Sequence, residues 1–575
     1  HSHADAILAL TNNKRADELL KAVFGDELAV IPYRRPGFLL SKWVGETARQ
    51  RPDIKGVVLL NHGLITWHDD PEEAYRLHIE MVDRAARFAR DQGPGIRGQL
   101  TDGGRWTVDG EIQRPLSTEQ RRDIASRIAP VLRGALGAHG RVIVRFDDSE
   151  EVLRFVSGGS VPLERLPEVL AQGAATPDHI LNTKRTALWI GDEGRETKDE
   201  GQREPSALVS RHYKAWVREY EEYYREHTTG EEMLPPVPRV VLVEGVGMFS
   251  VGKDSRAATI SNDIYRHTIE IVEAAERVGE YRSLALREAF EAEYWPLELY
   301  KLTLAPPEKE LSRRVALITG AAGAIGAGIA RRFAQEGAHV VCADLDLERA
   351  QAVAEELTKA CPSNRSIAVR MDVTDEGSVR EGFVLAVLEY GGVDVLVSNA
   401  GVAKGAAIDE LTLEEWERNF AVNARGHFLV VREALRIMKA QGTGGSVVFI
   451  ATKNVVVPGK DFAAYSASKA AEAQLARVLA LEGAPFGIRS NMVNPDAIFA
   501  GSGVWTPELR EARARAQGIK PEELEEHYRL RNLLQVEVTA DDVALAALFL
   551  ASDRSAKTTG TMLPVDGGLR EAFPR

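Results

Sequence analysis

The sequence has 575 residues, of which 44% are apolar and 27% are charged, a composition typical of a globular protein with several domains. Its formal net charge of −13 argues against nucleic acid as a partner, because phosphate binding needs a basic surface. With two cysteines, no apolar run long enough to cross a membrane and no signal peptide, it predicts a cytoplasmic protein without disulfides or a thiolate metal site.

The chain begins with two histidines separated by one serine, His1-Ser-His3. In a strand both side chains point to the same side, so His1 and His3 can bind one metal ion. A remnant of a purification tag would lie in the same place. A third histidine favours the metal site, because His62 follows the apolar strand Gly56-Val-Val-Leu-Leu60 and precedes a glycine.

His-x-His, Asn61-His-Gly63 and a helix that begins Pro71-Glu-Glu-Ala74 together resemble the class II aldolase/adducin family. The resemblance implies an α/β domain over residues 1–92, in which His1, His3 and His62 bind a divalent ion, usually zinc. That ion acts as the Lewis acid when a sugar phosphate is cleaved. The resemblance also implies a catalytic role for Tyr33. Because the family's acidic base and most of its phosphate-binding loops precede His-x-His, we expect this domain to be incomplete at its N-terminus.

The middle region, residues 105–300, follows a glycine-rich linker, Gln92–Gly104. Its strand Arg239-Val-Val-Leu-Val243 and the following helix repeat the rhythm of the strand at Gly56 and its helix. In this alignment Glu244 and Gly245 stand where Asn61 and His62 should be, and His179 is a candidate relic of the first ligand pair. We hypothesise a degenerate aldolase-like repeat without a metal. The alternative is a generic α/β insertion, since one strand and one helix recur easily by chance.

A proline-containing linker, Leu304–Leu311, leads to the strand Val315–Ile318, a glycine-rich turn and a helix. Such a turn lets a pyrophosphate approach backbone N–H groups at a helix N-terminus. The cofactor-binding candidates of the turn are Gly320, Gly323, Ile325 and Gly326. Asp344 ends the next strand, where a carboxylate accepts the ribose hydroxyls of NAD and repels the extra phosphate of NADP. The alternative is that Asp344 only caps the next helix.

Tyr465 and Lys469 lie four residues apart in an alanine-rich segment that is predicted to be helical to about Glu482. This spacing puts both side chains on one face, where the ammonium stabilises the phenolate and makes the phenol a proton donor and acceptor at neutral pH. Alone, the pair is also compatible with an ordinary surface helix.

Residues 312–575 resemble a short-chain dehydrogenase/reductase, through Asn399-Ala-Gly401, Asn423, Tyr465, Lys469, Asn494-Pro495 and Val565-Asp-Gly-Gly568 in family order. The resemblance implies a Rossmann fold with a doubly wound parallel sheet. It also implies the following roles: Tyr465 as general acid/base, Lys469 lowering its pKa and holding the nicotinamide ribose, Asn423 supporting a water relay, Asp372 near the adenine, and Asn399 and Gly401 at the cofactor. Two departures are Thr452 in place of the usual serine and the spacing of the glycines. A loop from Asp496 to Trp505 is expected to set substrate specificity.

An aldolase-like domain fused to such a dehydrogenase resembles the bifunctional rhamnulose-1-phosphate aldolase/lactaldehyde dehydrogenases. This resemblance implies cleavage of L-rhamnulose 1-phosphate to dihydroxyacetone phosphate and L-lactaldehyde, followed by oxidation or reduction of the lactaldehyde with NAD. It implies small-molecule partners, no membrane, and a homo-oligomer, dimer or tetramer. The alternative is a dehydrogenase for another sugar or polyol joined to a non-catalytic, adducin-like scaffold, which need not bind zinc.

Overall fold

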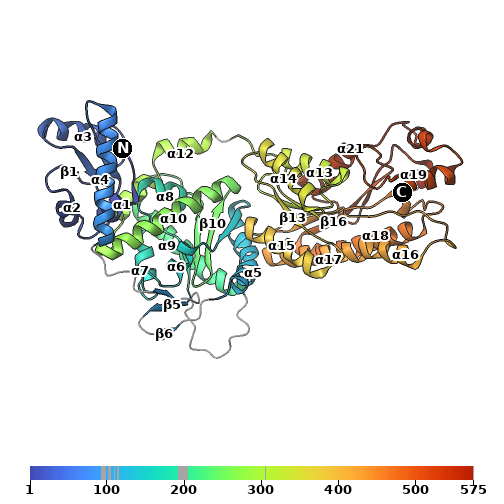
Figure 1. Ribbon diagram of the computed structural model, residues 1–575, viewed down its shortest axis with the longest axis horizontal. Coiled ribbons are helices and arrows are strands. Elements are labelled where there is room, and N and C mark those ends of the chain that lie inside the picture. The colour runs from blue at the N-terminus through green and yellow to red at the C-terminus, as the bar shows by residue number, and fades with distance from the viewer. Residues whose placement is uncertain are drawn as a thin grey trace. The chain divides into compact units, whose positions relative to one another are not determined.

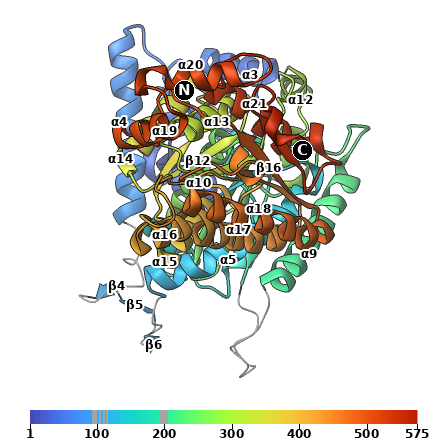
Figure 2. The ribbon, with the colours of Figure 1, turned by 90° about the vertical axis from the view of Figure 1, so that its right-hand side faces the viewer.

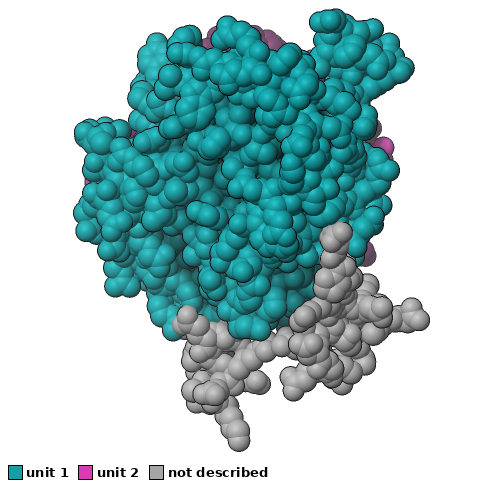
Figure 3. Space-filling view, turned by 90° about the vertical axis from the view of Figure 1, so that its left-hand side faces the viewer, with its two compact units in different colours: residues 1–125, 145–252, 257–306 teal, residues 126–144, 253–256, 307–575 magenta. Residues whose placement is uncertain are grey.

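We describe the protein from a computed structural model. The structure describes residues 1–91, 99–101, 105–108, 111–112, 116–191, 205–304 and 306–573, so most of the predicted linker Gln92–Gly104 lies outside the described residues. The chain forms two compact units, coloured separately in Figure 3: unit 1 holds residues 1–125, 145–252 and 257–306, and unit 2 holds residues 126–144, 253–256 and 307–575. Within the described ranges, every helix is too short or too polar to serve as a membrane span.

The first sheet of unit 1 has the order β1-β2-β3 (Figure 1). β1 (Leu28–Ile31) and β2 (Gly56–Leu59) run parallel, and β3 (Gly63–Thr66) runs antiparallel to β2. Ser2 forms a bridge with Leu64 on the other side of β3, so the first residues of the chain extend this sheet. The surrounding helices are α1 (Asp5–Thr11), α2 (Ala16–Phe24), α3 (Phe38–Gln50) and α4 (Pro71–Asp91).

The second sheet has the order β7-β10-β9-β8, with β8 parallel to β9 and β9 antiparallel to β10. Its strands are β7 (Ile143–Asp147), β8 (Leu188–Ile190), β9 (Val240–Val243) and β10 (Gly247–Gly252). The helices of this region are α5 (Thr118–Leu136), α6 (Glu150–Val156), α7 (Leu166–Gln172), α8 (Pro177–Thr183), α9 (Pro205–His227), α10 (Ser255–Val278), α11 (Leu286–Glu293) and α12 (Pro296–Thr303). A separate sheet contains β4 (Gln99–Thr101), β5 (Arg105–Val108) and β6 (Glu111–Ile112).

The two larger sheets of unit 1 are built alike. Each has a parallel pair, a tight turn into an antiparallel strand, and a long helix after that strand, α4 in one and α10 in the other. The turns match in detail, because Leu59 pairs with Gly63 and Val243 pairs with Gly247. The residue in the middle of each turn has a positive φ, 53° at Asn61 and 67° at Gly245.

This register corrects the alignment expected from the sequence. Gly245, not Glu244, occupies the position of Asn61, and Val246 occupies the position of His62. The strand that corresponds to His1-Ser-His3 is β7, because a Cβ on Gly63 would meet the carbonyl oxygen of Ser2 and a Cβ on Gly247 would meet that of Asp147.

His179 is therefore not the relic of the first ligand pair, as the sequence had suggested. Phe146 and Asp148, which flank Asp147, hold the positions of His1 and His3. His179 lies on α8 instead, buried, with its Nδ1 at 2.8 Å from the hydroxyl oxygen of Thr268.

Unit 2 contains a seven-stranded sheet in the order β13-β12-β11-β14-β15-β16-β17, parallel throughout. The strands are β11 (Val315–Thr319), β12 (His339–Asp344), β13 (Ile367–Arg370), β14 (Val395–Ser398), β15 (Gly445–Ile450), β16 (Ile488–Pro495) and β17 (Met562–Val565). All of β11 and β14 is buried, as expected of apolar strands covered on both faces. The predicted Rossmann-type sheet is confirmed, and its order reverses between β11 and β14, where such sheets bind dinucleotides.

Helices cover both faces of this sheet, and Figure 2 shows α13 and α21 on one side and α17 and α18 on the other. The helices are α13 (Ala324–Gln335), α14 (Leu347–Ala360), α15 (Glu376–Tyr390), α16 (Leu413–Phe420), α17 (His427–Gln441), α18 (Ala463–Gly483), α19 (Pro507–Gln517), α20 (Leu524–Arg531) and α21 (Ala540–Ala551). A π-helical turn, Ala421–Gly426, joins α16 to α17. Such turns occur often at functional sites.

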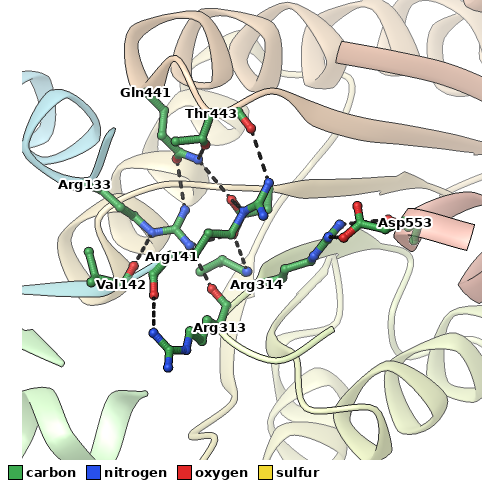
Figure 4. Close-up of polar contacts among 11 residues, drawn as sticks. Arg133, Arg141, Val142, Arg313, Arg314, Gln441, Thr443 and Asp553 are labelled. Carbon is green, nitrogen blue, oxygen red and sulfur yellow. Dashed lines mark hydrogen bonds and ion pairs between the residues drawn. The ribbon is translucent and has the colours of Figure 1, made fainter. Parts of the chain in front are cut away.

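Unit 2 also includes residues 126–144, which the sequence assigned to the middle region. Arg133 of α5 is 2% exposed, and its guanidinium donates to Asp394 Oδ2 at 2.6 Å and to Gln441 Oε1 at 3.0 Å (Figure 4). α5 approaches closely because residue 134 is glycine, where a Cβ would lie 1.8 Å from the carbonyl oxygen of Gln441. Asp394, at the start of β14, also accepts from the backbone N–H of Val315 at 2.8 Å. A buried ion pair therefore holds this segment against the sheet.

Candidate active sites

The three histidines predicted to bind a metal lie together in unit 1. The ring centroids are 4.8 Å apart for His1 and His3, 5.2 Å for His1 and His62, and 5.0 Å for His3 and His62. One nitrogen from each ring lies within 4.8 Å of the others. His62 is brought there by the turn between β2 and β3, and the bridge between Ser2 and Leu64 holds His1 and His3 beside it.

Asp178 of α8, which no sequence motif marked, completes the surroundings of the histidines. Its Oδ2 lies 2.9 Å from Nδ1 of His3, which leaves Nε2 of His3 for a metal ion. The hydrogen bond with His3 lowers the pKa of Asp178, so that it stays ionised. Burial lowers the pKa of His62 to about 4, and its Nδ1 is buried without a partner among the described residues. Three imidazoles, one of them oriented by a carboxylate, suit a zinc ion.

A cavity of about 200 Å³ opens onto the three histidines. Asp178, Arg35, Trp295 and Glu298 also line it. The guanidinium of Arg35 lies 5.8 Å from the centre of the Trp295 ring, so a cation stands beside the candidate metal site.

Tyr33, the predicted catalytic residue, is not among the residues that line this cavity. Its ring packs in a small buried cluster with Ala174, Ile180, Leu284, Ala289 and Ala292. Its hydroxyl is buried without a hydrogen-bond partner in the described part of the chain, and burial raises its pKa. The geometry supports a packing role for Tyr33, and a role in catalysis stays a prediction without support from the structure.

In unit 2, the glycine turn after β11 is the candidate dinucleotide site. Gly320 has a φ of 66°, and a Cβ on Gly326 would lie 2.2 Å from the carbonyl oxygen of Gly320, so both positions require glycine. Gly323 precedes the first residue of α13, and Ile325 in the first turn of that helix packs against the core. A hollow of about 500 Å³ lies beside this turn, lined by Ala322, Gly323, Arg349 of α14 and Gly501, among others.

Asp344 and Asp372 end up where the sequence predicted them, after neighbouring strands. Asp344 Oδ2 accepts from the backbone N–H of Ala322 at 2.9 Å, so the carboxylate faces the glycine turn. It does not cap α14, since the N-cap of that helix is Asp346. Asp372 lies beyond β13, and Thr374 holds its pKa below the usual value through two hydrogen bonds to Oδ1. Both aspartates suit the adenosine end of NAD.

Asn399, which follows β14, joins this strand to the glycine turn. Its Nδ2 donates to the carbonyl oxygens of Thr319 at 2.9 Å and Gly320 at 3.2 Å. Gly401 lies two residues further, and a Cβ at that position would stand 3.7 Å from Nζ of Lys469. The turn and the predicted proton-transfer residues therefore belong to one site.

Tyr465 and Lys469 project from α18 toward this site. Burial raises the pKa of Tyr465, while the ammonium of Lys469 and a hydrogen bond with Thr452 lower it. Asn423, in the π-helical turn, accepts from the backbone N–H of Val402 at 2.9 Å and donates to the hydroxyl of Ser468 at 3.1 Å. Thr452, Tyr465, Lys469 and Asn423 therefore lie close together, and their roles in proton transfer stay a prediction.

The loop after β16 contains the region predicted to set specificity. Asp496 forms a two-pronged ion pair with Arg531 of α20, at 2.5 Å and 2.6 Å. Phe499 of this loop stacks on Trp505 and packs against Tyr528 of α20. These aromatic side chains hold the loop against the helices α19 and α20. Lys453, next to Thr452, is a further cation here, and burial together with Arg531 lowers its pKa to about 8.

Glu472, which no sequence motif marked, lies three residues after Lys469 on α18. Its side chain is fully buried, and its Oε2 is 2.6 Å from Nζ of Lys469. His427 of α17 is also buried, with Nε2 at 3.7 Å from the same oxygen. The signal in the sequence was a glutamate among alanines on the inner face of a helix, which is costly unless it has a partner.

Family models match three stretches of the chain. Residues 1–89 match the class II aldolase and adducin N-terminal domain, and residues 123–302 match the aldolase class II second domain. Residues 320–570 match a model described as enoyl-(acyl carrier protein) reductase. The match at residues 123–302 covers the sheet that repeats the architecture of the first one.

Curated proteins match the whole chain or its second half. The oxidoreductase YuxG of Bacillus subtilis (strain 168) is 42% identical over 576 residues, which is 100% of this chain and 81% of that protein. D-threitol dehydrogenase of Mycolicibacterium smegmatis is 34% identical over 262 residues, 45% of this chain and 93% of its own. A solved short-chain type dehydrogenase/reductase from Mycobacterium marinum is 30% identical, with a TM-score of 0.40 over 45% of this chain and 96% of its own.

Proposed function

Because this chain belongs to the family of the Bacillus subtilis oxidoreductase YuxG, with class II aldolase domains ahead of a short-chain dehydrogenase/reductase domain, we propose that it is a bifunctional sugar-catabolic enzyme. Its first half cleaves L-rhamnulose 1-phosphate to dihydroxyacetone phosphate and L-lactaldehyde. Its second half oxidises or reduces the lactaldehyde with NAD. The observation that carries the proposal is that one chain holds both a three-histidine cluster and a Tyr465–Lys469 pair beside a dinucleotide turn.

In the dehydrogenase half, Tyr465 takes the proton from the hydroxyl of the substrate, or of the hydrated aldehyde. The Thr452 hydroxyl, which already bonds with Tyr465, orients the reacting oxygen. NAD, when bound, accepts the hydride that leaves the substrate carbon. The carboxylate of Asp344 supports NAD over NADP, because it stands at the ribose end of the turn and would repel a further phosphate.

In the aldolase half, His1, His3 and His62 would hold the divalent ion, which supplies Lewis-acid polarisation of a carbonyl or enediolate oxygen. Asp178 fixes the ring of His3 in the orientation that presents Nε2. Arg35, at the mouth of the same cavity, offers a positive charge to a phosphorylated substrate. Retro-aldol cleavage yields an aldehyde, and a short-chain dehydrogenase on the same chain can consume it.

A second candidate is a dehydrogenase for another sugar or polyol with a scaffold in place of an aldolase. The similarity to D-threitol dehydrogenase, a protein named for a polyol, favours testing it. Zinc content separates the two, because a scaffold need bind none.

The first experiment supplies the purified chain with NAD and L-lactaldehyde and follows NADH formation against a panel of small aldehydes and polyols, threitol included. A preference for lactaldehyde supports the proposal. The first half is then tested with L-rhamnulose 1-phosphate as the substrate. The variant Tyr465→Phe separates the two activities, because it should abolish the oxidation of lactaldehyde and leave the cleavage of the sugar phosphate in place. Turnover of a polyol with lactaldehyde inert would overturn the rhamnose assignment and leave a dehydrogenase.

A further inference from the structure

A buried carboxylate stands directly behind the lysine of the proposed proton-transfer pair. Glu472 has an exposed fraction of 0% and Lys469 one of 3%, and Oε2 of the glutamate lies 2.6 Å from Nζ of the lysine. Tyr465, Lys469 and Glu472 follow one another at spacings of one helical turn along α18, so they share one face of the helix. The ion pair therefore extends the Tyr465–Lys469 pair into the interior.

Burying a carboxylate at this position costs free energy of folding. The next buried residues of α18 on this side are apolar, Ala473, Ala476 and Leu479. An apolar residue would fill the same space without the several kcal/mol that removing a charge from water costs. Oε1 of Glu472 is buried and has no hydrogen-bond partner among the described residues. Glu472 is thus not explained by packing.

Glu472 constrains where the ammonium of Lys469 can point. An ammonium has three N–H donors. One direction is taken by Glu472, and Nζ donates to the carbonyl oxygen of Ile450 at 2.9 Å. Gly401, in the candidate cofactor site, is also a neighbour of Nζ, since a Cβ on Gly401 would lie 3.7 Å from it. Two fixed partners therefore aim the third donor at the site between β14 and α18.

We propose that Glu472 is a positioning residue that holds Lys469 in place and, through its own charge, sets how strongly Tyr465 acts as a base. The proposal rests on the dehydrogenase function proposed above. When Glu472 is ionised, it offsets the positive charge that stabilises the phenolate. When Glu472 is neutral, the full charge of Lys469 acts on Tyr465.

Few titratable groups lie near Glu472 among the described residues, so these few decide its charge. Among the described residues, the titratable groups that face it are Lys469 and Tyr465 on its own helix and His427 on α17. Burial lowers the pKa of His427 well below 6.5, so this ring stays neutral, and its Nδ1 lies 2.7 Å from the hydroxyl oxygen of Ser398. Burial raises the pKa of Glu472 to about 7, although Lys469 opposes this. Burial and Lys469 therefore act in opposite directions on the charge of Glu472.

The variant Glu472→Gln removes the charge and keeps the shape of the side chain. Without a carboxylate that opposes Lys469, Tyr465 should ionise more easily, and the acidic limb of kcat/KM for alcohol oxidation should move to lower pH by about 1 unit. The matched control is Glu482→Gln, the same change at an exposed position of the same helix, which should leave the profile in place. A variant that lost stability but kept the parent profile would overturn the proposal.

A second variant protects the test against poor folding of the first. Glu472→Asp keeps the charge and withdraws it by one methylene from Nζ, so the limb should shift in the same direction by less, and an unshifted limb would again overturn the proposal. Any alcohol that the enzyme oxidises serves, so inert lactaldehyde would refute the substrate assignment and not this proposal. If no alcohol is oxidised, the ionisation of Tyr465 is followed directly by the ultraviolet absorbance of its phenolate as the pH rises. Subtracting the curve of the Tyr465→Phe protein leaves the signal of Tyr465 alone. In the Glu472→Gln background, this signal must appear at lower pH than in the parent background.

Discussion

The ion pair between Arg133 and Asp394 makes the dehydrogenase unit depend on a segment that precedes it by more than a hundred residues. Replacing Arg133 by methionine leaves Asp394, whose side chain is 1% exposed, without its main partner. Breaking a buried pair in this way costs about 3–5 kcal/mol. Asp394 keeps Arg141 at 3.3 Å and the N–H of Val315 at 2.8 Å, so we expect the lower end, about 3 kcal/mol.

The assay is hydrogen exchange of peptides from β14 and β15, because the chain has two units and a single melting curve would mix them. Arg133→Met should lower the free energy of opening of both strands. Adding Asp394→Asn removes the charge that has lost its main partner and should recover part of the loss. The matched control is Arg127→Met, on the same helix and in the same unit but with no part in this ion pair. Unchanged protection of β14 and β15 in Arg133→Met would refute the reasoning.

The same pair makes a prediction about pH. Burial alone would raise the pKa of Asp394, but Arg133, Arg141 and the hydrogen bonds hold it below its usual value. A carboxyl group with a depressed pKa in the folded state stabilises the protein above its unfolded pKa, about 4, and the contribution disappears as the pH falls through the folded pKa. The stability difference between the parent and Arg133→Met with Asp394→Asn should therefore shrink below about pH 4. A difference that stayed constant would contradict this assignment.

Three further predictions test the individual sites. Tyr465→Phe should lower kcat by about 100-fold or more while NAD affinity, read by fluorescence titration, changes little, and an active variant would refute the role of the phenol. Asp344→Asn should raise the preference for NADP over NAD by about tenfold, the equivalent of about 1.4 kcal/mol, and an unchanged ratio of kcat/KM values would count against the ribose assignment. Asp178→Asn should weaken zinc binding by about 10-fold to 100-fold in competition with a chelator, whereas Asp17→Asn, at an exposed position of α2, should not.

The dehydrogenase half could be predicted because the residues of its motifs are close together in the sequence. The strand before Gly320, the glycine turn and the helix after it follow one another directly, and Tyr465 and Lys469 share one helical face. Spacing along the chain therefore fixes geometry. Glu472 lies on the same face, three residues after Lys469, but the burial of this pair could be known only from the structure, in which Ile450 contacts Lys469 and His427 lies near Glu472.

Contacts between residues that are far apart in the sequence could not be predicted in this way. Asp178 reaches His3 from α8, and Arg133 reaches Asp394 from α5, and nothing near either residue in the sequence marks its partner. The helices themselves were partly predicted, since the alanine-rich segment expected to be helical from Tyr465 to about Glu482 corresponds to α18, Ala463–Gly483. What the sequence lacks is the packing that brings one helix to a distant strand.

The misaligned repeat shows how a short hairpin can mislead. The comparison rested on the apolar runs at Gly56 and Arg239, but in the structure Val240 corresponds to Gly56, because Val243 and Leu59 hold equivalent places before their turns. A register error of one residue moves every side chain of a strand to the opposite face. Here it put Gly245 in place of His62, and the turn geometry alone corrects it.

The corrected register separates what the fold requires from what the metal site requires. Ser2 bonds with His78 of α4 at 2.6 Å, and Asp147, at the place of Ser2, accepts from Asn262 of α10 at 2.9 Å. A polar link between the edge strand and the long helix is thus kept in both halves with different residues.

The ligand positions, in contrast, have lost all three imidazoles in the second half. Phe146 stands for His1 and packs on Phe249 with ring centroids 5.1 Å apart. Asp148 stands for His3 and pairs with Arg121 at 3.3 Å, and Val246 stands for His62 within the buried turn. Each replacement is accommodated by contacts within the protein: a ring contact for Phe146, an ion pair for Asp148 and burial for Val246. This half therefore keeps the architecture without needing an ion. The two halves therefore support the view that a fold supplies positions and that chemistry depends on the few residues placed there.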